Sequence, residues 1–107
     1  YYFTKDNDNG LNFACYHSAI TSAGGSYTGL SKTTGSFADK EGEDTDTVCT
    51  IAFGDNEVLD EGDTLIVNFC INHSDWSNFN KGNDYSGKSV EHIVIRSSKG
   101  IIFGEEP

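Results

Sequence analysis

The sequence predicts an all-β protein, either a sandwich or a barrel. No long stretch repeats its apolar residues at the 3.6-residue spacing of an amphipathic helix. Short runs rich in β-branched and aromatic residues instead alternate with clusters of Gly, Ser, Asn and Asp. The chain has 107 residues with 12 Gly and 1 Pro, so the turns are built from glycine. This length fits a single domain over 1–107.

Seven segments have the composition of strands. In chain order they cover 1–4, 12–17, 34–38, 47–53, 64–71, 90–96 and 100–103. The first opens with three aromatic residues and a threonine, which favour an extended backbone. The second sets aromatic residues among polar ones, and the third is short and weak. The fourth alternates, so that Cys49, Ile51 and Phe53 share one face.

The strongest strand pattern lies in the second half of the chain. At 64–71, Leu65, Val67 and Phe69 fall on one face. The last two expected strands are joined by a tight turn at 97–100 and form a hairpin.

Polar segments separate these strands. We expect a glycine-rich loop at 18–29, a solvated acidic loop at 39–46 and a tight turn at 60–63. The long polar loop at 74–89 carries the one Trp of the chain. A polar loop of this length is usually functional or held by a ligand.

The charge balance restricts the partners. The formal net charge is −10, which argues against nucleic acid and against an anionic membrane surface. No apolar run approaches the ~20 residues of a membrane helix, so membrane insertion is not expected. A neutral ligand or a cation such as calcium fits this charge better.

An enzymatic role is not expected, and no catalytic residue is assigned. The paired carboxylates Glu41/Glu43 and Asp60/Glu61 lie in acidic turns, where solvated charge is commoner than a glycosidase pair. The three His residues have no metal-ligand spacing. The three Cys, which are Cys15, Cys49 and Cys70, match no zinc pattern, and their odd count leaves a free thiol unless another chain pairs with it.

Two groups of oxygen donors suggest a calcium site. Asn80, Asn83 and Asp84 follow one another closely in the long loop, and Thr4 and Asp6 end the first strand. Calcium takes 6–8 such oxygens. The alternative is that these residues serve turn geometry alone, and spacing does not decide between the two.

Several blocks of the sequence resemble the family 3 carbohydrate-binding module, the cellulose-binding module of scaffoldins and cellulases. They read YYFTKD at 1–6, NFACYH at 12–17, GSYTG at 25–29, SDWSNF at 74–79 with NDYS at 83–86, and FGEEP at 103–107. The resemblance implies an antiparallel jelly-roll β-sandwich with a structural Ca²⁺. By position, the calcium ligands would be Thr4, Asp6, Asn80, Asn83 and Asp84.

The resemblance also implies a planar aromatic strip that binds cellulose. By position, the strip would contain Tyr16, His17, Tyr27 and Trp76. Aromatic rings stack on the flat faces of glucose rings and give a large contact area at low entropic cost. The strip departs from the family at Tyr16, where an acidic residue is usual, and at Cys70, where an arginine is usual. Ala14 replaces a common tryptophan.

Two functions follow from this resemblance. The first is non-catalytic binding of cellulose or a related β-glucan, as a module of a larger exported protein that is extracellular or attached to the cell surface. The second is a structural or assembly module whose strip has decayed. The chain has no Met and no signal-peptide pattern, so we expect a processed piece of a longer protein.

The family fold begins with further strands that this chain lacks, so we expect an N-terminally incomplete sandwich. The gap would uncover the face of Leu65, Val67 and Phe69 or the facing sheet. A strand from another segment or another chain would then complete the fold.

Overall fold

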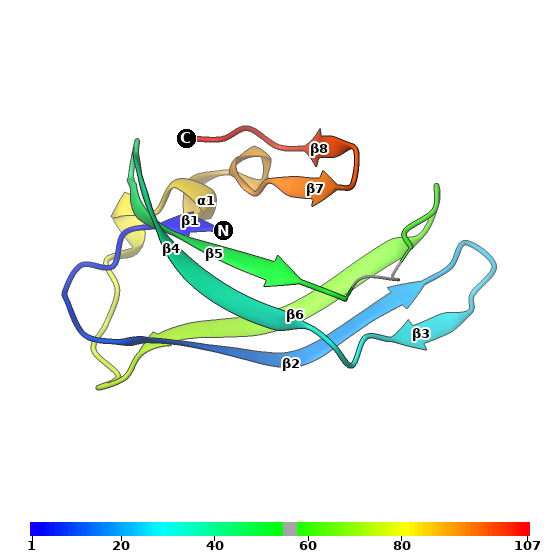
Figure 1. Ribbon diagram of the computed structural model, residues 1–107, viewed down its shortest axis with the longest axis horizontal. Coiled ribbons are helices and arrows are strands. Elements are labelled where there is room, and N and C mark those ends of the chain that lie inside the picture. The colour runs from blue at the N-terminus through cyan, green and yellow to red at the C-terminus, as the bar shows by residue number, and fades with distance from the viewer. Residues whose placement is uncertain (55–57) are drawn as a thin grey trace.

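The computed structural model describes residues 1–54 and 58–107 and is built almost entirely of antiparallel strands (Figure 1). The strands are β1 (Tyr2–Phe3), β2 (Leu11–Thr21), β3 (Tyr27–Gly29), β4 (Thr34–Gly42), β5 (Thr45–Ala52), β6 (Thr64–His73), β7 (Ile95–Ser97) and β8 (Gly100–Phe103). Three short helical segments lie between β6 and β7: η1 (Lys81–Asn83), α1 (Tyr85–Lys88) and η2 (Val90–His92). Within the described ranges, no helix is long and apolar enough to cross a membrane.

One sheet has the strand order β3-β2-β6 and forms the long lower layer in Figure 1. β2 and β6 pair from Leu11 opposite His73 to Thr21 opposite Thr64. The register shifts between Cys15 and His17, which marks a β-bulge at Tyr16.

A second sheet has the order β1-β5-β4, and aromatic rings pack between it and the first sheet, where Tyr1 beside β1 meets Phe69 of β6 edge to face at 6.1 Å. The rings of Phe13 and Phe69 stack with centroids 5.9 Å apart, and Phe3 meets Phe37 edge to face at 6.3 Å. A Cβ at Gly35 would lie 2.3 Å from Cγ of Phe13. Glycine is therefore required where β4 crosses the ring of Phe13 on β2.

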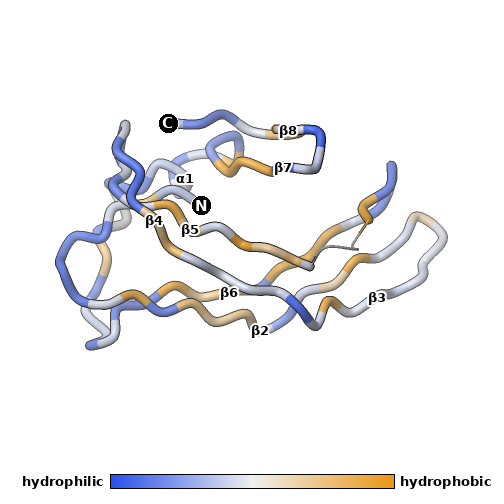
Figure 2. Tube along the Cα trace, viewed as in Figure 1, coloured by the Kyte–Doolittle hydropathy of each residue, from blue (hydrophilic) through white to orange (hydrophobic). Residues whose placement is uncertain are grey.

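The β7–β8 hairpin lies on the side of the molecule opposite β2 (Figure 1). Its two strands are exposed along their whole length although they carry Ile95, Ile101, Ile102 and Phe103. Figure 2 shows these apolar positions next to the hydrophilic turn and C-terminal segment.

Several expected strands are confirmed. The expected final hairpin is present over Ile95–Phe103, and so is the alternation in β5 and β6, where Cys49 is buried and Leu65, Val67 and Phe69 are half-buried.

Four expectations about the elements were wrong in part. The acidic segment 39–46 is not a loop: β4 continues to Gly42 and β5 begins at Thr45. β4 is an edge strand, so its acidic side chains can reach solvent without breaking the pairing. The segment 18–29 is largely strand, because β2 runs to Thr21 and turns into β3. The segment 90–96 begins as η2, and 74–89 contains η1 and α1.

Candidate functional site

The outward face of the β3-β2-β6 sheet carries Tyr16, His17 and Tyr27, whereas Trp76 lies in the turn that follows β6. Side chains alternate along a strand, so His17 would normally share the inward face with Phe13 and Cys15. The extra residue at the bulge reverses this alternation, and Tyr16 and His17 are both exposed.

The expected aromatic residues are open to solvent. The exposed fractions are 70% for Tyr16, 63% for Tyr27 and 74% for Trp76. The rings of His17 and Tyr27 are nearly parallel, with an angle of 16° and centroids 6.1 Å apart. The two rings therefore lie in nearly parallel planes next to each other, although they come from different strands.

These side chains are spread along the sheet. Tyr27 pairs with Thr21 at one end of β2, and the turn that carries Trp76 follows His73, which pairs with Leu11 at the other end. The ten steps of β2 between these ends span ~33 Å. Tyr16 and His17 lie between them, so the four positions are distributed along the length of β2.

Tyr16 lies near Cys70, the residue at the position where the family usually has an arginine. The neighbouring Cys70 side chain raises the pKa of the Tyr16 hydroxyl. An open hollow beside this pair is bordered by His17, Tyr27 and Thr33. The departure from the family therefore leaves hydrogen-bonding groups on the face.

Residues of the expected calcium set come together at a second place, where β1 ends. The hydroxyl of Thr4 donates to the backbone carbonyl of Asn83 at 2.8 Å, and the Thr4 amide donates to Asp84 Oδ1 at 3.0 Å. Asp6 accepts from the backbone N–H of Asn80 and from Nδ2 of Asn83, each at 2.7 Å. The Asn80 side chain instead accepts from the N–H of Gly82, where it caps η1.

The electrostatics of this cluster favour a cation. Asp84 is only 8% exposed. Burial raises the pKa of its carboxyl, and the charges of Asp6, Asp44 and Asp46 raise it further, against a lowering by the Thr4 hydrogen bond. Oδ1 of Asn83 is buried and has no hydrogen-bond partner among the described residues. An unpartnered buried oxygen beside a buried carboxylate fits a hard cation.

The ligand set is poor in charged donors. In the part of the chain that the structure describes, no group of three or more His, Cys, Asp or Glu side chains is placed to hold a metal. A cation here would therefore depend on two carboxylates together with hydroxyl, amide and carbonyl oxygens.

Sequence reasoning missed Asp46. Its Oδ1 accepts from the backbone N–H of Lys5 at 3.0 Å, and its charge acts on Asp84. Its assignment to a solvated loop hid this role. The sequence signal was the alternation of Thr45, Asp46 and Thr47, which extends the pattern of β5 towards its N-terminus.

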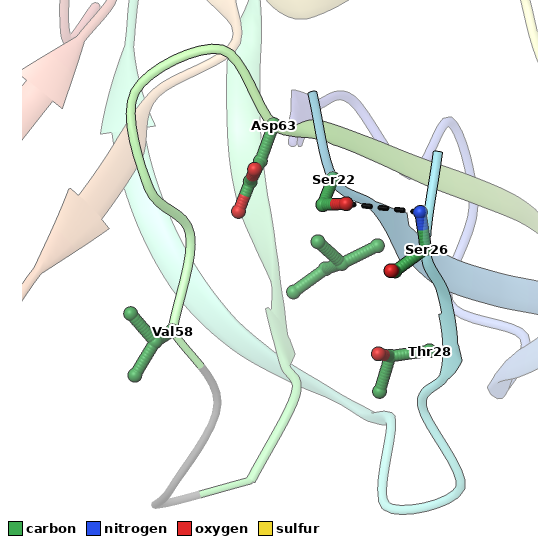
Figure 3. A pocket seen from close by; sticks show the side chains of 6 residues that line it. Ser22, Ser26, Thr28, Val58 and Asp63 are labelled. Atoms are coloured by element: carbon green, nitrogen blue, oxygen red, sulfur yellow. Dashed lines mark hydrogen bonds between the residues drawn. The ribbon is translucent and has the colours of Figure 1, made fainter. Parts of the chain in front are cut away.

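A small hollow lies at the far end of the same sheet, between the β2–β3 turn and the segment before β6 (Figure 3). The Ser22 hydroxyl accepts from the Ser26 N–H at 3.0 Å, and Thr28 and Asp63 also line the hollow. None of the expected site residues lines it.

Comparison with known proteins identifies the family of this fold. A family model described as "Cellulose binding domain" matches residues 1–103. Cellulosomal-scaffolding protein A of Acetivibrio thermocellus is 34% identical over 116 residues, covering 100% of this chain and 6% of the relative. Endoglucanase A of Paenibacillus lautus is 33% identical over 116 residues, covering 100% of this chain and 15% of the relative. The chain thus spans a small part of the relatives that it matches.

Solved structures confirm the antiparallel jelly-roll β-sandwich. The CBM3a-L domain with flanking linkers from scaffoldin cipA of Clostridium thermocellum superposes with a TM-score of 0.80 at 30% identity, covering 100% of this chain and 68% of the other. A family IIIA CBD from Clostridium cellulolyticum gives a TM-score of 0.78 at 28% identity, covering 100% and 72%.

Proposed function

The chain belongs to the family 3 carbohydrate-binding modules, which are non-catalytic cellulose-binding domains, and we propose that it binds cellulose or a related β-glucan through the outward face of the β3-β2-β6 sheet. The observation that carries this proposal is the β-bulge at Tyr16, which turns two neighbouring side chains outward on the same face as Tyr27.

The binding step needs little rearrangement of the sheet. Tyr16, Tyr27 and Trp76 offer ring faces for stacking on the C–H faces of glucose units, and His17 adds a polar ring. Because β2, β3 and β6 are paired, the backbones under Tyr16, His17 and Tyr27 are already ordered before the ligand arrives. Bond making and breaking play no part in this role.

Depletion of the protein by microcrystalline cellulose tests the proposal. The wild-type chain should be removed from solution, and Trp76→Ala should remain. If neither protein is depleted, the binding role is refuted.

We also propose that Thr4, Asp6, Asn80, Asn83 and Asp84 hold one structural Ca²⁺. Support comes from the buried, unpartnered Oδ1 of Asn83 and from the buried carboxyl of Asp84. When bound, the ion would neutralise this carboxylate and tie the end of β1 to the segment before α1. Elemental analysis of the purified protein, followed by calcium titration of an EDTA-treated sample, tests the site. No calcium and no saturable binding would refute it.

The context proposed for the module is a larger exported protein. Its relatives include cellulosomal scaffolding proteins and an endoglucanase, of which this chain matches 6–15%. We propose an extracellular or surface-attached location on this basis. Recovery of the parent protein from the intact cytoplasmic fraction, with none in the medium or on the cell surface, would refute it.

The alternative is a structural or assembly module completed by a strand from another segment or chain. The exposed β7–β8 hairpin favours it, because within the described ranges these strands pair only with each other, and an isolated two-stranded sheet is marginally stable. Amide exchange distinguishes the two roles. Slow exchange across β7 and β8 in a monomer that binds cellulose would reject the alternative.

A further inference from the structure

Trp76 is held in place by its backbone rather than by packing of its ring. The ring is 74% exposed, so few neighbours restrain it. Its φ of 61° lies in the left-handed region, which is unfavourable for a bulky residue and persists only when surrounding contacts impose it. The presentation of this side chain therefore depends on what fixes the turn.

One carboxylate spans the Trp76 position. Oδ1 of Asp75 accepts from the backbone N–H of Ser77 at 3.1 Å, and Oδ2 accepts from Nδ2 of Asn9 at 2.6 Å. The first contact closes the turn around Trp76. The second ties that turn to the loop between β1 and β2.

Further contacts reinforce this link. Asn7 Nδ2 donates to the Ser77 hydroxyl at 3.0 Å, and Asn7 Oδ1 accepts from the N–H of Asn9 at 2.9 Å. The N–H of Trp76 donates to the carbonyl of His73 at 2.8 Å. Hydrogen bonds with Ser77 lower the pKa of Asp75, so at neutral pH its contacts are charge-assisted.

We infer that Asn9 and Asp75 are positioning residues that hold Trp76 in a binding-ready orientation. This inference rests on the proposed function, in which Trp76 contacts the glucan. A turn that is already ordered loses less conformational freedom when the ligand binds, so the Asn9–Asp75 contact strengthens binding without touching the ligand.

An exchange of the two residues tests this inference in the intact chain. Asn9→Asp places two carboxylates where a donor met an acceptor and should break the contact. In Asn9→Asp/Asp75→Asn the new amide donates to the new carboxylate, while its oxygen still accepts from Ser77. The pair and its net charge are restored. Asn78→Asp is the matched control, because Asn78 is exposed and takes part in none of the hydrogen bonds of the described residues.

Two readouts are required for each variant. Adsorption isotherms on microcrystalline cellulose should show about two- to tenfold weaker binding for Asn9→Asp, with recovery in the exchange variant and no change in Asn78→Asp. The chain has 1 Trp, so the decay of tryptophan fluorescence anisotropy reports on Trp76 alone. Asn9→Asp should add a fast local motion that the exchange variant removes, at a nearly unchanged melting temperature.

The outcomes separate this inference from the proposed function. If the wild type does not bind cellulose, the proposed function fails, while the anisotropy decay still decides whether the contact orders Trp76. If the wild type binds and Asn9→Asp matches it in affinity and anisotropy, the positioning role is wrong. A loss that the exchange variant does not recover also overturns it.

Discussion

Replacing Trp76 with alanine should weaken binding to cellulose without unfolding the module. A buried Trp contributes ~150–250 Å² of contact area. The ring is 74% exposed in the free protein, and stacking on a flat surface covers one of its two faces, which leaves roughly 60–90 Å² to be buried. At ~25 cal/mol/Å², this area is worth about 2 kcal/mol, or roughly a thirtyfold change in affinity.

The same exposure predicts a small effect on folding, because truncating an exposed side chain leaves no cavity. The melting temperature of Trp76→Ala should lie close to that of the wild type, since surface substitutions usually cost less than ~0.5 kcal/mol. Adsorption isotherms with thermal unfolding of the same samples check both parts. Ile102→Ala is the control, because Ile102 is also exposed but lies on β8, away from the strip. Unchanged affinity of Trp76→Ala, or an equal loss in Ile102→Ala, would refute this reasoning.

Three further predictions concern stability. Calcium at 100 times its Kd should stabilise the native state by ~2.7 kcal/mol, which raises the melting temperature by roughly 10 °C. Calorimetry with and without EDTA measures this shift, and identical unfolding curves would count against the calcium site. Because the pKa of Asp84 is raised in the folded state, protonation of its carboxyl favours folding. This contribution to the free energy of unfolding is fully present below the unfolded pKa of ~3.9 and is lost as the pH rises through the folded pKa. Without calcium, the wild type should therefore gain stability relative to Asp84→Asn on acidification towards pH ~4; urea unfolding at several pH values checks the sign, and a relative loss would contradict it. Gly35→Ala places a Cβ 2.3 Å from Cγ of Phe13 and should lower the free energy of unfolding by ~1–3 kcal/mol. In the control Gly24→Ala, only the Ser22 hydroxyl lies near the new Cβ, at 3.8 Å, so denaturant unfolding should show almost no change.

The strands that could be predicted from sequence are those with one buried face. β6 shows its inward side chains as Leu65, Val67 and Phe69, and burial on one face produces this alternation. β4 is an edge strand whose second half carries Asp39 and Glu41, and nothing in its composition separates a paired edge from a solvated loop. Pairing with β5 decides its structure, and this pairing is a tertiary property.

The candidate site shows the same limit. Residue type and family position predicted which side chains to examine, but strict alternation along β2 would place His17 on the inward face. The bulge that turns it outward arises from pairing with β6, where Cys15 faces Phe69 and His17 faces Asn68. Likewise, Asn9 and Asp75 are 66 residues apart in the chain, so no local pattern relates them.

The proposed binding face therefore combines two kinds of support. Tyr16, His17 and Tyr27 stand on paired strands, and the ladder of β2 with β3 and β6 fixes their backbones. Trp76 stands on a turn, where the loop between β1 and β2 supplies the restraint. Within that loop, Asp6 accepts hydrogen bonds from Asn80 and Asn83 of the candidate calcium cluster, and Asn9 reaches the Trp76 turn. A single short loop thus connects the cluster that would hold the cation to the side chain that would stack on the glucan, whereas the rest of the strip is fixed by the sheet itself.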